Sequence, residues 1–115
     1  MKTTPAIQQI DQQIQTVKTQ LLALGDLRPG SLTRQYNVCG KPNCRCKDRE
    51  NPRRHGPYYQ LSYVHQGKST SRFIRAPQLP EIRKQLATYR EFRRLTQRWV
   101  ALAMRKAESL LKASR

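Results

Sequence analysis

All three cysteines of the chain lie between residues 39 and 46, and one of its two histidines, His55, follows shortly after them. Thiolate sulfur and imidazole nitrogen are ligands that structural zinc sites use, and four of them arranged tetrahedrally close such a site. The Cys39-x4-Cys44 pair is within the ligand spacing of such sites. The set Cys39, Cys44, Cys46 and His55 therefore predicts a structural Cys3His site for Zn²⁺.

The short step from Cys44 to Cys46 constrains the backbone of this site. In an extended chain, side chains two residues apart point the same way but stand too far apart to bind one metal ion. The backbone must therefore turn at Arg45, or only one of the two cysteines binds. The surrounding residues are rich in Pro, Gly and cationic types, which cannot build a core, so the loop needs a cross-link.

Other interpretations of the same residues remain open. Reduced cysteines can pack as small hydrophobic residues, with His55 in a surface turn. Redox chemistry is a third interpretation, because the neighbouring Lys41, Arg45 and Lys47 would favour thiolates. His65 is the alternative histidine ligand, although its position in a predicted hairpin turn favours a solvated residue.

Charge is the strongest global feature of the sequence. The 115 residues include 23 Lys and Arg against 7 Asp and Glu, giving a net charge of +16. The first 27 residues are neutral in balance, whereas residues 28–75 carry eleven basic side chains against two acidic ones. Such an excess is typical of nucleic-acid-binding proteins, and it assigns the polyanion surface to the part of the chain after residue 27.

A helix is predicted over residues 5–24, before the cysteine loop. Apolar residues recur at alternating spacings of three and four, as they do along a helix-packing seam: Ile7, Ile10, Ile14, Val17, Leu21 and Leu24. Pro5 suits the helix start and Gly25 its end. The seam predicts an intramolecular partner in the C-terminal helix, a homodimer with coiled-coil packing, or another helical protein as the partner.

Three strands are predicted to hold the loop. The segments show alternation of apolar and polar residues or are rich in β-branched and aromatic residues; they comprise residues 32–38, 58–64 and 69–75. Between the last two segments, Gln66-Gly67-Lys68 indicates a hairpin turn. The first strand delivers Cys39 and the second follows His55. A metal bound there would join the ends of these two strands.

A long helix is predicted over residues 80–112. Projected as one helix, it has a core stripe and a separate basic stripe; the core stripe comprises Ile82, Leu86, Tyr89, Phe92, Val100, Ala103, Ala107 and Leu111. Leu95 and Leu102 fall outside this stripe, which suggests a second helix partner or a kink.

Together these elements predict one α+β domain spanning residues 1–115. An N-terminal helix precedes a three-stranded antiparallel sheet over residues 28–75, with a zinc-ribbon-like metal loop at 39–55, and a long C-terminal helix follows. We expect one face of the sheet to be covered by a helix, with Tyr63 and Phe73 in the core. Since neighbouring strand residues face opposite ways, one of Tyr58 and Tyr59 should be exposed.

The motifs of this segment resemble those of a family of short bacterial proteins without an established activity. The resemblance is carried by Arg-Pro-Gly-Ser-Leu at 28–32, Tyr-Asn-Val-Cys-Gly-Lys from residue 36, Cys-Arg-Cys at 44–46 and His-Gly-Pro-Tyr-Tyr from residue 55. It implies a genuine cysteine and histidine module and a following helix. If relatives are carried on mobile elements, it also favours DNA as the partner.

The predicted function is non-enzymatic binding of nucleic acid, with DNA favoured over RNA. The predicted contact residues are Arg34, Lys41, Arg45, Lys47, Arg49, Arg53, Arg54, Tyr58, Tyr59, Lys68, Arg72, Arg75, Arg83, Arg90 and Arg94. The cations would contact phosphates and the tyrosines would stack on unpaired bases. The alternative is a protein–protein adaptor or dimerisation module within a larger nucleoprotein complex.

Enzymatic activity is not expected from this sequence. The few acidic residues leave little for a two-metal site or a carboxylate acid–base pair, and four protein ligands on zinc leave no position for an activated water. No membrane span and no secretory signal are visible, so we expect a cytoplasmic protein. Clustered cysteines in that compartment favour metal binding over disulfides.

Overall fold

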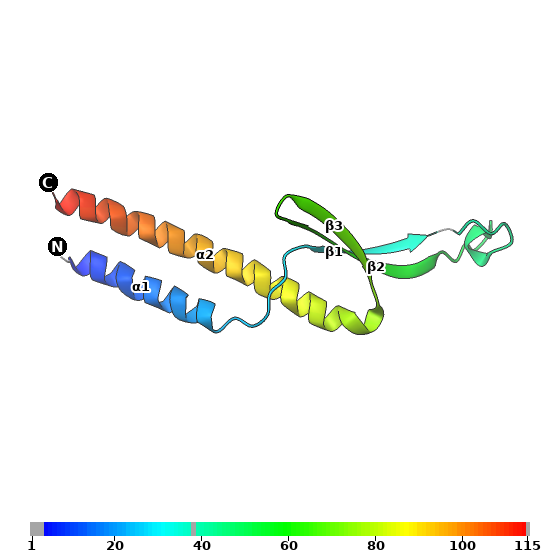
Figure 1. Ribbon diagram of the computed structural model, residues 1–115, viewed down its shortest axis with the longest axis horizontal. Coiled ribbons are helices and arrows are strands. Elements are labelled where there is room, and N and C mark those ends of the chain that lie inside the picture. Colours follow the sequence, from blue (N-terminus) through cyan, green and yellow to red (C-terminus); the bar gives the residue numbers. More distant parts are fainter. Residues whose placement is uncertain (1–3, 38, 115) are drawn as a thin grey trace. The chain divides into compact units, whose positions relative to one another are not determined.

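A computed structural model describes residues 4–37 and 39–114 of the chain. Along the chain lie α1 (Pro5–Leu22), β1 (Ser31–Asn37), the 3₁₀ turn η1 (Arg45–Lys47), β2 (His55–His65), β3 (Lys68–Ile74), the 3₁₀ turn η2 (Ala76–Gln78) and α2 (Leu79–Ala113) (Figure 1). This order confirms the predicted α+β fold of a helix, a three-stranded antiparallel sheet and a long helix. Val38, the predicted last residue of the first strand, lies outside the described residues.

The described residues form two compact units. One comprises residues 28–86 and contains the sheet and the cysteine loop; we call it the sheet unit. The other combines residues up to 27 with those from 87 onward and contains α1 and most of α2; we call it the helical unit. The single domain predicted for residues 1–115 stays a prediction.

The start of α1 follows from its local sequence. The hydroxyl of Thr4 accepts a hydrogen bond from the backbone N–H of Ile7 at 3.2 Å, and Pro5 occupies the first turn, where its missing N–H costs nothing. The helix ends at Leu22, two residues before the predicted end, because the N–H of Leu24 bonds to the carbonyl of Leu21 and tightens the last turn.

The three strands lie in sequence order, with β2 in the centre and antiparallel to both neighbours. Gln66 and Gly67 connect β2 to β3, with φ angles of 51° and 77°. A two-residue hairpin turn of this kind needs positive φ at both positions and matches the twist of the strands. The turn pairs His65 with Lys68, and this sets the register of the whole hairpin.

One face of the sheet carries the core of the sheet unit. Leu61, at the centre of β2, is 1% exposed and packs with Ile82 and Leu86 from the first turns of α2. Leu32, Tyr63 and Ile74 surround them. The prediction for Tyr63 is confirmed, whereas the prediction that Phe73 lies in the core is wrong. Phe73 pairs with Gln60 instead of Leu61, so its side chain emerges on the other face.

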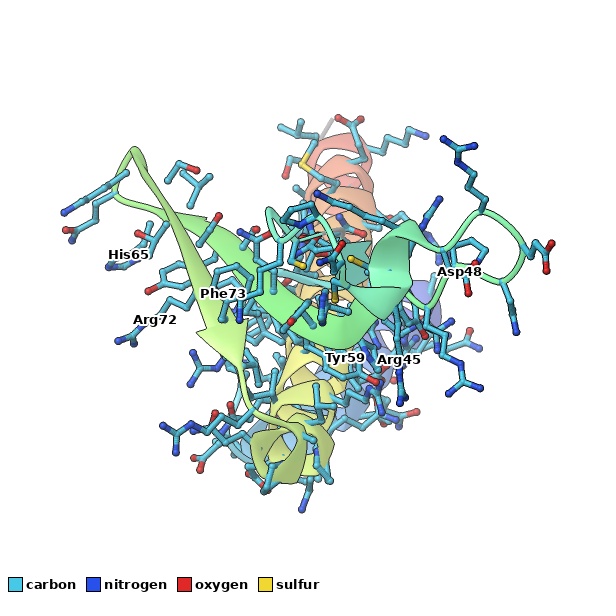
Figure 2. The ribbon with its side chains drawn as sticks, turned by 90° about the vertical axis from the view of Figure 1, so that its right-hand side faces the viewer. Arg45, Asp48, Tyr59, His65, Arg72 and Phe73 are labelled. Carbon is cyan, nitrogen blue, oxygen red and sulfur yellow. The ribbon has the colours of Figure 1, made fainter. Side chains whose placement is uncertain are left out.

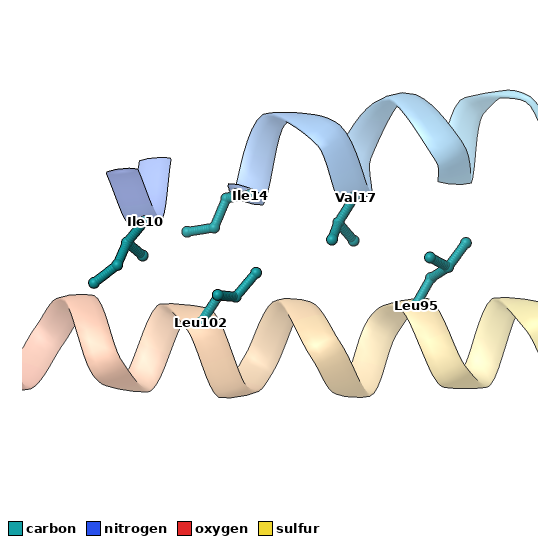
Figure 3. Packing of buried hydrophobic residues seen from close by; sticks show 5 residues of the cluster. All are labelled: Ile10, Ile14, Val17, Leu95 and Leu102. Carbon is teal, nitrogen blue, oxygen red and sulfur yellow. The ribbon is translucent and has the colours of Figure 1, made fainter. Parts of the chain in front are cut away.

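The helical unit has its own core between α1 and the later part of α2 (Figure 3). Ile10, Ile14 and Val17 of α1 pack against Leu95 and Leu102 of α2. The intramolecular alternative for the seam is thus the arrangement observed, with Ile7 buried and Leu21 and Leu24 partly buried. Pairing with a second chain through the same residues stays a prediction.

The core stripe predicted for the long helix is wrong in its second half. Leu95 and Leu102 are almost fully buried, whereas Val100 is 62% exposed and Leu111 is exposed as well. The reason is that the two halves of α2 have different partners, the sheet for Ile82 and α1 for Leu95. A single projection of the whole helix averages over both partners.

Candidate metal centre and cationic surface

The four predicted ligands converge at the loop end of the sheet unit. One ligand atom from each of Cys39, Cys44, Cys46 and His55 lies within 4.8 Å of all the others. The Cys39 and Cys46 sulfurs are 3.5 Å apart, and the Cys44 sulfur is 3.0 Å from Nε2 of His55. The three thiols are free. These four side chains therefore lie close enough together to hold a metal ion.

The 3₁₀ turn η1 explains how both Cys44 and Cys46 reach the same point. Cys44 caps the turn in an extended conformation, and the N–H of Lys47 bonds to its carbonyl at 3.0 Å. The chain therefore reverses at Arg45, as the spacing required. Cys46 becomes the most buried of the three cysteines, at 3% exposed.

Strand β2 positions the histidine. It begins at His55, three residues before the predicted start, and pairs His55 with Asn37 at the end of β1. The following Gly56 has a φ of 135°, and a Cβ there would lie 2.8 Å from the carbonyl oxygen of Gln35. Glycine is thus needed for β1 and β2 to approach each other beside the ligand.

Two of the separations between ligand atoms are close to those of a tetrahedral metal site. With Zn–S bonds of about 2.3 Å and Zn–N bonds of about 2.0 Å, the ligands of such a site stand roughly 3.5–3.8 Å from one another. The 3.5 Å between Cys39 and Cys46 already matches this, and the 3.0 Å between Cys44 and His55 needs only a slight opening. The donor set of three sulfurs and one imidazole suits a soft or borderline divalent ion.

The environment of the thiols differs from one to the next. The backbone N–H of Cys46 and the Cys39 thiol hydrogen-bond to the Cys44 sulfur and lower the pKa of Cys44 to about 6. Burial acts in the opposite direction on Cys46 and raises its pKa. The Cys46 sulfur also accepts a hydrogen bond from the N–H of Cys39 at 3.3 Å. The Cys44 thiol is thus more readily deprotonated for metal binding than the Cys46 thiol.

His65 does not compete for this site. It lies at the far end of β2, next to the hairpin turn, and is exposed. Among the described residues, the cluster with metal-ligand geometry contains His55 and no other histidine. His55 and His65 lie at opposite ends of β2, and only the His55 end is next to the cysteines.

The loop between the ligands is strongly cationic. Its six basic side chains, Lys41, Arg45, Lys47, Arg49, Arg53 and Arg54, are all exposed, and none forms an ion pair within residues 4–37 and 39–114. The N–H of Arg53 bonds to the carbonyl of Arg45 at 3.0 Å and brings these two residues together. With Asp48 and Asn51 they line a depression of about 310 Å³. Arg45 and Asp48 are labelled in Figure 2.

The remaining predicted cations divide between the two units. Arg34, Lys68, Arg72, Arg75 and Arg83 belong to the sheet unit, and Arg90 and Arg94 to the helical unit; all are exposed. The strand register places Arg34 opposite Tyr59 and Arg72 opposite Leu61. The side chains of both arginines therefore project from the face that carries the core. Because both residues are exposed, their guanidinium groups reach solvent at the edge of that face.

Three of these arginines contact other side chains. The guanidinium of Arg34 lies 5.8 Å from the ring centroid of Tyr36. The guanidinium of Arg83 lies 5.8 Å from the ring centroid of Tyr59. Arg94 is paired with Glu91 one turn away, which lowers the pKa of the Glu91 carboxyl. Arg94 is therefore the predicted contact residue least available to a phosphate.

The aromatic side chains separate as strand alternation requires. Tyr58 is 41% exposed, and Tyr59 lies on the core face beneath Arg83. Sequence reasoning missed Phe73, which is 70% exposed. The sequence of the hairpin turn could have revealed this exposure. A two-residue turn at Gln66-Gly67 pairs residue 60 with residue 73, so the side chain of Phe73 cannot lie on the same face as Leu61.

None of the helices within the described residues combines the length and apolar character that crossing a membrane requires.

Neither the curated proteins nor the solved structures contain a match to this sequence. The sequence model of one protein family matches residues 7–84, which include most of α1, the whole sheet, the ligand loop and the start of α2. Because this match covers more than half of its residues, the chain belongs to the family described as Domain of unknown function (DUF6788).

Proposed function

We propose that this chain is a non-enzymatic, zinc-stabilised protein that binds nucleic acid through the cationic loop between its metal ligands. Zn²⁺ would be held by Cys39, Cys44, Cys46 and His55 in a closed structural site. The loop, the adjoining strands and the start of α2 would then present arginines and lysines to phosphates. DNA is the polymer that the sequence favours.

Zinc is the metal that this donor set favours. Three thiolates and one imidazole form a common structural zinc set, and four protein ligands leave no position for a reactive water. A zinc ion with three thiolates carries one net negative charge. Lys41, Arg45 and Lys47 lie next to the ligands in sequence and would offset that charge.

The observation that carries the nucleic-acid proposal is the state of the six loop cations. Each is exposed, and none is engaged by a carboxylate in the described parts of the chain. The positive charges of these unpaired side chains repel one another and destabilise a small unit unless a polyanion neutralises them. A phosphate backbone supplies regularly spaced charges to such a surface.

A second candidate function rests on the later part of α2. Val100, Met104 and Leu111 are exposed apolar residues spaced by four and seven positions along this helix. A stripe of this kind suits a helical protein partner and favours the adaptor function. The two candidates use different units and are therefore separable by mutation.

Elemental analysis of the purified protein tests the metal. We expect one zinc per chain in the native sequence and in His65→Gln, and loss of zinc in His55→Gln. The two variants make the same chemical change on the same strand, so they form a matched pair. Equal zinc content in both variants, or none in the native protein, would exclude the proposed site.

Oligonucleotide binding across a salt series tests the partner. Removing the side chain that neutralises one phosphate should reduce the slope of log K against log salt by about 0.7–0.9. We therefore expect the double variant Arg45→Gln/Arg53→Gln to reduce the slope by roughly 1.4–1.8 units. Arg94→Gln is the control, because Arg94 is already paired with Glu91. An affinity that depends on neither salt nor oligonucleotide length would instead support the adaptor function.

A further inference from the structure

The face of the sheet opposite the core, which we call the open face, differs in composition from the rest of the sheet unit. Strand register assigns to it Thr33, Gln35, Tyr58, Gln60, Ser62, Val64, Ser69, Ser71 and Phe73. Side-chain contacts confirm the assignment. Gln35 donates to Oε1 of Gln60 at 3.0 Å, and the Ser62 and Ser71 hydroxyls lie 3.1 Å apart.

The open face carries no charged side chain among the described strand residues. This is unexpected in a chain with 23 lysines and arginines. The basic residues of the strands, including Arg34 and Arg72, start from the other face. A surface that only contacts phosphates would carry such cations itself, so the open face is suited to a different part of a ligand.

Two aromatic side chains lie exposed at the loop-proximal end of this face. Phe73 is 70% exposed and Tyr58 is 41% exposed, and both line a depression of about 440 Å³ that is also lined by Pro57, Tyr59, Ile74, Arg75 and Ala76. Figure 2 shows Phe73 on β3, next to Arg72. An exposed phenylalanine in a small unit with a thin core is a costly use of an apolar residue unless a ligand covers it.

We propose that the loop-proximal end of the open face binds an unpaired stretch of nucleic acid, with a base stacked on Phe73 and Tyr58. This rests on the proposed nucleic-acid function and names its ligand as a single strand. Bases are flat and uncharged, and their edges carry donors and acceptors that Gln35, Gln60 and Ser71 can match. Arg75, in the same depression, takes a neighbouring phosphate, so the charges at the border complement those of the strand.

A duplex does not fit this face in the same way. Its bases are stacked on one another and present only their edges in the grooves. The unpaired bases of a single strand can stack on aromatic side chains. Such stacking does not depend on the base sequence, because every base has a flat face. The cationic loop, by contrast, can contact phosphates of either form. The open face therefore decides the preference between the two forms.

Binding of a fluorescent single strand of about 16 nucleotides and of a duplex of the same length tests the proposal, with DNA and RNA strands as parallel arms. We expect tighter binding of a single strand than of the duplex. Phe73→Ala should weaken single-strand binding by about 5- to 150-fold and leave duplex binding unchanged. Phe73→Tyr should retain binding and Phe73→Leu should weaken it as Phe73→Ala does, since only the former keeps a flat ring.

Val64→Ala is the matched control, because Val64 is an exposed apolar residue of the same face outside the depression. Zinc content, measured for every variant, reports that the unit is intact. Equal single-strand binding by the native protein and by Phe73→Ala would overturn the proposal. So would a self-associated state in ultracentrifugation that Phe73→Ala abolishes without affecting strand binding.

The test also separates this inference from the function on which it rests. Salt-sensitive binding of duplex and single strand alike, insensitive to Phe73, would exclude base stacking and leave the phosphate-binding function in place. Absence of salt-sensitive binding to either form would exclude both.

Discussion

The two units of the chain are stabilised in different ways. The helical unit buries five apolar side chains in one cluster, from Ile10, Ile14 and Val17 to Leu95 and Leu102. The cluster in the sheet unit has three buried members, Leu61, Ile82 and Leu86. The sheet unit also contains all three cysteines and the cationic loop.

This difference shows how a short sequence can combine a packed helical core with a cationic loop. A loop of Pro, Gly and cationic residues cannot bury apolar area, so its shape needs a local cross-link. The helical unit has no such need, because regular seams of apolar residues pack against each other. We therefore expect the two units to respond differently to removal of the metal and to truncation of apolar side chains.

Removal of the proposed zinc ion should have the largest effect. Structural zinc contributes apparent binding free energies of about 10–16 kcal/mol, more than any single core contact. Chelation, or Cys46→Ser, should abolish amide protection from residue 39 to residue 55 and at the adjoining strand ends. Protection in α1 and in residues 87–113 should persist, as measured by hydrogen exchange. Concerted loss of protection in both units would show that they are not independent.

Truncation of the helical core should have the next largest effect. Leu102→Ala removes a side chain that is 2% exposed and should cost about 2–5 kcal/mol of unfolding free energy. Val100→Ala, two residues earlier on the same helix, should change stability by less than about 0.5 kcal/mol because it is exposed. Thermal unfolding followed by circular dichroism measures both, and zinc content should stay unchanged. Equal effects would mean that the seam is wrongly assigned.

Replacing a glycine just before β1 tests how tightly the backbone of the sheet unit is packed compared with that of the helical unit. Gly30 has a φ of 135°, and a Cβ there would lie 2.7 Å from the carbonyl oxygen of Ser62. Gly30→Ala should therefore cost about 1–3 kcal/mol through strain in the sheet unit. Gly25→Ala is the control, since no atom lies within 4 Å of a Cβ at that position. Denaturant unfolding would contradict this prediction if the two variants had the same midpoint.

The smallest expected effect concerns the Arg94–Glu91 pair on the surface of α2. The Arg94 guanidinium holds the pKa of Glu91 below its usual value, so the pair stabilises the folded state at neutral pH. That contribution disappears as the pH falls through the lowered pKa of Glu91. Arg94→Gln should return the pKa of Glu91 towards its usual value in an NMR titration. An unchanged titration would mean that the pair does not persist in solution.

Local patterns in the sequence predicted much of this protein. Residue types and spacing predicted the cluster of Cys39, Cys44, Cys46 and His55, the hairpin turn at Gln66-Gly67 and the existence of all five main elements. These features depend on interactions between residues that are close along the chain. Element ends were shifted by one to three residues, because capping bonds such as that from Leu24 to Leu21 decide them.

Partners and faces were decided by the tertiary structure. The stripe of α2 that is buried changes along the helix, because Ile82 meets the sheet and Leu95 meets α1. Phe73 was expected in the core, but the register of the hairpin exposes it. Periodicity shows that a segment has an apolar side. Which side is covered depends on the neighbouring element, and that neighbour is often distant in the sequence.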